Sequence, residues 1–120
     1  MLKNYKELIV WQKAYQLVLE TYKITAKFPK SENYGLASQM RRSSVSIVSN
    51  IAEGYQRQHT GEYIQFLSIA FGSCAELETQ LMITKDLSYT TNEDFIKLSN
   101  LVNEVNKMLN SMIRKLKERV

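Results

Sequence analysis

Apolar residues return every three or four positions along four stretches of the chain, which is the period of an amphipathic helix. The first stretch covers about residues 7–28 and carries two adjacent apolar stripes. One stripe consists of Trp11, Ala14, Val18, Tyr22 and Thr25, and the other of Val10, Leu17 and Ile24. Pro29 ends the pattern, because the residue before a proline avoids the helical region. The sequence therefore predicts a first helix over about 7–28.

The second stretch begins near 31–34 and continues to about residue 53. Ser31 is the expected N-cap, with Glu32 favourably placed in the first turn. Its apolar positions are Leu36, Met40, Ile47 and Ile51, with Val45, Val48 and Ala52 beside them. Gly54 follows where a left-handed glycine often ends a helix, so we expect the helix to stop there.

Two longer periodic stretches follow in the second half of the chain. Thr60 is the expected cap of the third, whose stripe is Tyr63, Leu67, Ala70, Cys74, Leu77 and Leu81. Thr91 and Asp94 resemble a capping box at the start of the fourth. Its stripe is Phe95, Leu98, Val102, Val105, Leu109, Met112 and Leu116. This spacing is typical of helices packed nearly parallel or antiparallel.

Four long helices joined by short loops predict an all-α fold, an antiparallel up-down-up-down four-helix bundle. A length of 120 residues fits a single domain over 1–120. Further apolar residues lie outside the predicted core stripes, and these are Leu8, Ile9, Leu19, Ile64, Phe71 and Met82. Exposed apolar surface often marks an interface, so the pattern favours self-association into a homo-oligomer. The alternative is a bundle with unusually broad apolar faces.

Composition narrows the class of protein further. The net charge is +4, and residues 1–60 carry nine Lys/Arg against four acidic residues. A basic half can attract nucleic acid or an acidic partner, or can simply aid solubility. A single cysteine, no signal sequence and no long apolar run predict a soluble, cytoplasmic protein with no membrane association.

The sequence offers few groups for catalysis. His59 is the only histidine, in a polar loop, and Cys74 lies on an apolar stripe where a small core residue is expected. One Cys and one His cannot form the common zinc sites, and no glycine-rich phosphate loop is present. We therefore expect no catalytic residues, no metal, no cofactor and no enzymatic activity.

The segment "RRSSVSIVSNIAEGYQR" places poor helix formers inside a predicted helix. Such small polar side chains allow two helices to approach closely, within one protomer or between two. The candidate seam residues are Ser43, Ser46, Ser49, Asn50 and Glu53. An ordinary solvated helix face is the alternative interpretation.

The same segment supplies basic and aromatic side chains together. Arginine and aromatic groups suit RNA or single strands, because they pair with phosphates and stack on bases. The candidate nucleic-acid-binding residues are Arg41, Arg42, Tyr55, Arg57 and His59. Scattered charge on solvated faces would explain them as well. A protein–protein module without a nucleic-acid role is therefore kept as the alternative function, and an RNA-processing enzyme is the third and weakest.

Three segments carry a resemblance: "VWQKAYQLV", "FPKSENYGLASQMRRSSVSIVSNIAEGYQR" and "EYIQFLSIAFGSCAELETQL". The most specific positions are Trp11-Gln12, Phe28-Pro29, Glu32, Tyr34-Gly35-Leu36, Gln39 to Arg42, Ser46, Asn50 to Gly54 and Glu76-Leu77. Over roughly residues 5–85 the chain resembles the bacterial four-helix bundle proteins encoded in 23S rRNA intervening sequences, also labelled S23 ribosomal proteins.

The resemblance implies an antiparallel bundle that assembles into a ring, commonly a homopentamer. It also implies kinship with the accessory protein of diversity-generating retroelements, a five-fold barrel that binds nucleic acid and its reverse transcriptase. RNA or a nucleic-acid enzyme is therefore the expected partner besides the chain itself. The basic character of this chain is weaker than that relative's role suggests, and no catalytic residues come with the resemblance.

Overall fold

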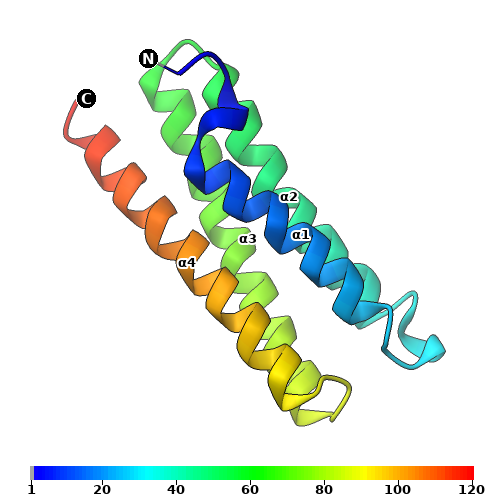
Figure 1. Cartoon of the computed structure of the whole chain (residues 1–120). Coiled ribbons are helices and arrows are strands. Elements are labelled where there is room, and N and C mark those ends of the chain that lie inside the picture. The colour runs from blue at the N-terminus through cyan, green and yellow to red at the C-terminus, as the bar shows by residue number, and fades with distance from the viewer. Residues whose placement is uncertain (1) are drawn as a thin grey trace.

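Four antiparallel helices make up almost the whole molecule. The structure is a computed structural model that describes residues 2–120. The helices are α1 (Ile9–Thr25), α2 (Leu36–Gln56), α3 (Thr60–Asp86) and α4 (Asn92–Lys117), with short 3-10 turns at Tyr5–Glu7 and Lys30–Glu32. Figure 1 shows them running alternately up and down, with both termini and the α2–α3 loop at one end. Each helix packs against two neighbours, in the cyclic order α1, α2, α3, α4, which confirms the predicted all-α bundle.

Large apolar side chains from all four helices fill the centre of the bundle. The largest that are fully buried are Leu17, Ile24, Met40, Ile47, Ile51, Leu67, Leu77, Leu81, Leu98, Val102, Val105 and Leu109. The predicted stripe of α3 is confirmed, since Tyr63 is half-buried and its other members are buried. The stripe of α4 is buried from Leu98 to Leu109 and half-buried at Phe95, Met112 and Leu116, and Ile113 is a further buried residue. The 3-4 spacing therefore identified the core faces of both long helices.

The core face of α1 differs from the prediction. It combines Val10, Leu17 and Ile24 of one stripe with Ala14 and Thr25 of the other, whereas Tyr22 is 44% exposed. Thr21, which lies on neither stripe, is also buried, and its hydroxyl donates a 2.7 Å hydrogen bond to the carbonyl of Leu17. Such a bond satisfies the hydroxyl, which makes burial of a polar side chain inexpensive.

Three predicted helix ends are wrong. Ser31 lies in the Lys30–Glu32 turn and is not the N-cap of α2, which starts after Gly35. Glu32 supports that start instead, because its Oε1 accepts a 3.1 Å hydrogen bond from the backbone N–H of Leu36. Thr60 is the first residue of α3, and His59 takes the cap position without a side-chain bond. Gly54 does not end α2, because the helix continues through it to Gln56.

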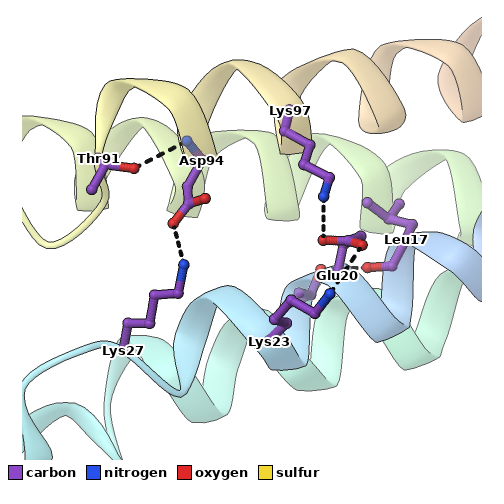
Figure 2. A network of polar contacts seen from close by, with 8 residues as sticks. Leu17, Glu20, Lys23, Lys27, Thr91, Asp94 and Lys97 are labelled. Atoms are coloured by element: carbon purple, nitrogen blue, oxygen red, sulfur yellow. Dashed lines mark hydrogen bonds and ion pairs between the residues drawn. The ribbon is translucent and has the colours of Figure 1, made fainter.

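The start of α4 agrees with the prediction. Thr91 is the N-cap, and its hydroxyl accepts a 3.1 Å hydrogen bond from the N–H of Asp94. Asp94 also pairs with Lys27, which follows α1, at 3.1 Å, and Figure 2 shows both contacts. Glu20 of α1 pairs with Lys97 of α4 at 3.3 Å, so charged side chains bridge the two helices at two levels in this view.

None of the helices within residues 2–120 combines the length and the apolarity that a membrane crossing requires.

Candidate nucleic-acid interface

Two serines of α2, Ser43 and Ser46, face α3 of the same chain. The Ser43 hydroxyl donates a 3.0 Å hydrogen bond to Oε1 of Gln80, and the Ser46 and Ser73 hydroxyls are 2.8 Å apart. Asn50 donates from Nδ2 to the carbonyl of Ser46 at 2.8 Å. We call Ser43, Ser46, Asn50, Ser73 and Gln80 the polar seam. It joins two helices within one protomer.

Two other candidate seam residues lie outside these contacts. Ser49 is exposed on α2. Glu53 is exposed and pairs with Arg57 one turn later, at 3.4 Å. Sequence reasoning missed Ser73 and Gln80, because their role depends on which helix faces α2.

The five candidate nucleic-acid-binding residues do not form one site. Arg41 and Arg42 lie in the first half of α2, whereas Tyr55, Arg57 and His59 lie at or beyond its end. At about 1.5 Å per residue, Arg41 and Arg57 are separated by about 24 Å along the helix axis. The helix therefore divides them into two clusters.

The cluster at the end of α2 is occupied by contacts within the chain. The Arg57 guanidinium lies 4.8 Å from the centre of the Phe66 ring, besides pairing with Glu53. Tyr55 meets Tyr63 edge to face, with ring centres 6.2 Å apart. Burial, and to a smaller extent Tyr55, raises the pKa of Tyr63, so its phenol stays neutral. Of this cluster, only the exposed His59 has no such contact among the described residues.

The cluster in the first half of α2 opens onto a groove of about 410 Å³ between α1 and α2. The groove is lined by Tyr22, Asn33, Ser38, Arg41, Arg42 and Val45. Nε of Arg41 donates a 2.9 Å hydrogen bond to Oγ1 of Thr25, and its guanidinium lies 4.9 Å from the centre of the Tyr22 ring. Arg42 is exposed. Two guanidiniums, a phenol, an amide and a hydroxyl thus meet in one groove whose lining includes no carboxylate.

Sequence reasoning found the two arginines of this groove and missed three polar partners. Ser38 could have been found, because it shares a helical face with Arg41, Arg42 and Val45 at spacings of three and four. Tyr22 and Asn33 could not, since they come from α1 and the α1–α2 connection.

Lysines on the opposite side of α1 are largely neutralised. Lys13 pairs with Glu104 at 3.3 Å, and Lys27 and Lys97 pair with acidic side chains as described above. Acidic side chains thereby offset most of the lysine charge on the α1–α4 face. The α1–α2 groove, by contrast, has no acidic side chain in its lining to offset the charge of Arg41 and Arg42.

Apolar side chains remain on the surface, as the sequence suggested. Ile9 is 61% exposed, Leu19 56% and Met82 55%. Leu8 and Ile9 line an apolar groove of about 600 Å³ between the start of α1 and α4, together with Met108 and Met112. Self-association through such surfaces stays a prediction.

The structure offers no arrangement for nucleophilic chemistry at Cys74. Its thiol is buried on the core face of α3. Burial, aided by the charge of Glu78, raises its pKa to about 12, so the thiol stays protonated near neutral pH. Within residues 2–120, no group of three His, Cys, Asp or Glu side chains could hold a metal ion.

Comparison with known proteins gives a family and solved structures of similar fold. The family model described as "23S rRNA-intervening sequence protein" matches residues 6–111. A crystal structure of a protein of unknown function from the S23 ribosomal protein family of Bacteroides thetaiotaomicron VPI-5482 superposes with a TM-score of 0.83 at 27% identity. The match covers 88% of this chain and 96% of that one. A search of curated proteins gave no match. Because the family model spans most of the chain, the protein belongs to the 23S rRNA-intervening sequence protein family.

Proposed function

We propose that this protein is a non-enzymatic, ring-forming adaptor that binds single-stranded RNA through the α1–α2 groove. The observation that carries the proposal is the pair Arg41 and Arg42, which line that groove beside Tyr22 with no carboxylate in its lining. Guanidiniums bind phosphate oxygens with two parallel hydrogen bonds. Membership in a family named for 23S rRNA intervening sequences agrees with an RNA partner.

The geometry of the groove favours a flexible strand over a duplex. Thr25 and Tyr22 hold the Arg41 guanidinium in place, so little side-chain entropy is lost when a phosphate binds. Asn33 and Ser38 add hydrogen-bonding groups for the sugar and backbone. A groove of about 410 Å³ accepts part of a single nucleotide, and a single strand can bend to enter it.

The ring is supported by apolar surface on separate faces. The stripe Ile64, Phe71, Ala75 and Met82 follows one side of α3, while Ile9 and Leu19 lie on α1. Unlike surfaces that bind one another produce head-to-tail contacts, and such contacts close into a ring when the rotation allows. A ring would repeat the arginine groove around its circumference, which increases avidity for a long strand.

The alternative is a self-assembling protein–protein module with no nucleic-acid role. The apolar groove of about 600 Å³ between α1 and α4 favours it, because its lining suits apolar side chains of a protein partner.

Binding of a uridine-rich RNA of about ten nucleotides at several salt concentrations tests the proposal. We expect affinity to fall steeply with salt, because binding releases counterions from the phosphates. The variant Arg42→Ala should lower affinity about tenfold and reduce the salt slope by about one. Arg57→Ala is the matched control and should bind like the wild type, because Arg57 lies in the other cluster. RNA binding that is absent, or insensitive to salt, would leave the protein–protein module as the better function.

A further inference from the structure

A second groove runs along the polar seam between α2 and α3. It has a volume of about 380 Å³ and is lined only by polar side chains, namely Gln39, Arg42, Ser43, Ser46, Glu76 and Gln80. Arg42 also lines the α1–α2 groove, so its side chain borders both. A nucleotide whose phosphate binds Arg41 and Arg42 can therefore direct its base across α2 into the second groove.

The α3 side of this groove has a defined order of hydrogen-bond donors and acceptors. The Ser43 hydroxyl donates to Oε1 of Gln80 at 3.0 Å, which leaves the amide nitrogen of Gln80 as the free donor. Glu76 lies one helical turn before Gln80 on α3, and within residues 2–120 it forms no ion pair. Its two carboxylate oxygens are acceptors. The α3 side of the groove thus offers the two acceptors of Glu76 one helical turn from the free donor of Gln80, while Arg42 and Gln39 of α2 add donors on the other side.

Only one of the four RNA bases presents the complementary order. The Watson–Crick edge of guanine carries two donors, N2–H and N1–H, followed by the acceptor O6. Cytosine presents one donor and two acceptors, uracil has a single donor between two acceptors, and adenine has one donor and one acceptor. A phosphate or carboxylate ligand is disfavoured on the α3 side of the groove, because Glu76 would repel it.

We propose that the α2–α3 groove binds a guanine base, with Glu76 accepting from N1–H and N2–H and Gln80 donating to O6. This inference rests on the proposed RNA binding at Arg41 and Arg42, and it adds base specificity to it. The small polar residues of α2 then serve two roles, since Ser43 both joins the helices and orients Gln80.

The test compares uridine-rich RNAs of about ten nucleotides that carry one central guanosine, adenosine, cytidine or inosine. Binding to the wild-type protein at fixed salt should be about tenfold tighter for the guanosine RNA than for the all-uridine RNA. Inosine lacks the N2 amino group, so its RNA should fall between the two. Adenosine and cytidine should give no gain.

Variants at two glutamates of α3 complete the experiment. Glu76→Gln should remove the guanosine preference and leave binding of the all-uridine RNA intact or slightly stronger. Glu78→Gln is the matched control, because Glu78 is exposed on α3 and lies outside the groove lining. It should keep the preference.

The outcomes separate this inference from the proposed function. If the all-uridine RNA binds in an Arg42-dependent way but guanosine gives no gain, or if Glu76→Gln retains the gain, the guanine site is wrong and RNA binding stands. If no RNA binds, both proposals fall.

Discussion

Gly54 lies inside α2 where α3 leaves no room for a side chain. A β-carbon at this position would stand 2.9 Å from Cβ of Phe66 and 3.0 Å from Cδ1 of Tyr63. Contacts this short force neighbouring groups to move. None of the described glycines has a positive φ, so the requirement at Gly54 concerns space and not backbone conformation.

The variant Gly54→Ala should therefore be less stable than the wild type. We expect overpacking to cost about 2–3 kcal/mol, which exceeds the gain of about 1 kcal/mol in helix propensity. Gly72→Ala is the matched control, because Gly72 lies in α3 with no atom within 4 Å of an added β-carbon. It should be stabilised by up to about 1 kcal/mol. Urea unfolding followed by circular dichroism measures both, and a Gly54→Ala protein as stable as the wild type would contradict the packing argument.

At the scale of elements, α2 and α3 share the most extensive helix–helix contact of the bundle. Their contact combines buried apolar side chains with the polar seam, where Ser43 and Ser73 are buried and hydrogen-bonded. Serine is a poor helix former in isolation. Here its small side chain lets α2 and α3 approach closely, and its hydroxyl forms a hydrogen bond to the other helix. These contacts offset its low helix propensity.

Ser46→Leu should disturb this contact more than the same change at an exposed serine. The added side chain would meet Ser73, whose hydroxyl now lies 2.8 Å from that of Ser46, and would leave Ser73 without that partner. We expect a loss of about 2 kcal/mol. Ser49→Leu, on the exposed side of α2, serves as control and should change stability by less than about 0.5 kcal/mol. Equal melting temperatures for the two variants would mean that the seam does not determine the packing.

The sequence was sufficient to predict the four helices, but not to predict where some of them begin and end. Periodicity identified four helices and the core faces of α3 and α4, because their apolar positions keep one phase throughout. Thr91 was predictable because its cap is local, made with Asp94 three residues away. Gly54 was misread, since the space for its side chain is taken by Phe66 of another helix, which leaves no trace in the local pattern. Ser31 was misread because the extra turn at Lys30–Glu32 moves the start of α2 to Leu36.

The candidate site was predictable only in part, because it depends on how the helices pair in the whole molecule. Arg41 and Arg42 were found, but grouping them with Arg57 ignored the length of α2, which separates the two clusters. Tyr22 and Gln80 reach their grooves from α1 and α3, so they are visible only once the helices are paired. Ion pairs such as Lys13–Glu104 likewise depend on the packing of α1 against α4. Sequence composition gives the amount of positive charge, and the fold decides where it stays unbalanced.

At the scale of the whole molecule, the exposed apolar residues predict self-association. Met82 belongs to the apolar stripe on α3 and is 55% exposed in the single chain. Covering such a side chain removes apolar surface from water, which favours association. Native mass spectrometry should therefore give a species near five times 14.0 kDa, the number of subunits that the family resemblance implies.

Met82→Glu places a charge in that stripe and should convert the assembly to a 14.0 kDa monomer, because burying an unpaired carboxylate is costly. Gln65→Glu adds the same charge to another exposed position of α3, outside the stripe, and should keep the assembly. Both variants should retain the helical content of the wild type, since both positions face away from the core. A monomeric wild-type protein, or an assembly that survives Met82→Glu, would show that this stripe is not the contact between subunits. RNA affinity of the monomeric variant then separates the two roles: a lone chain should still bind through Arg41 and Arg42, but without the avidity that repeated grooves provide.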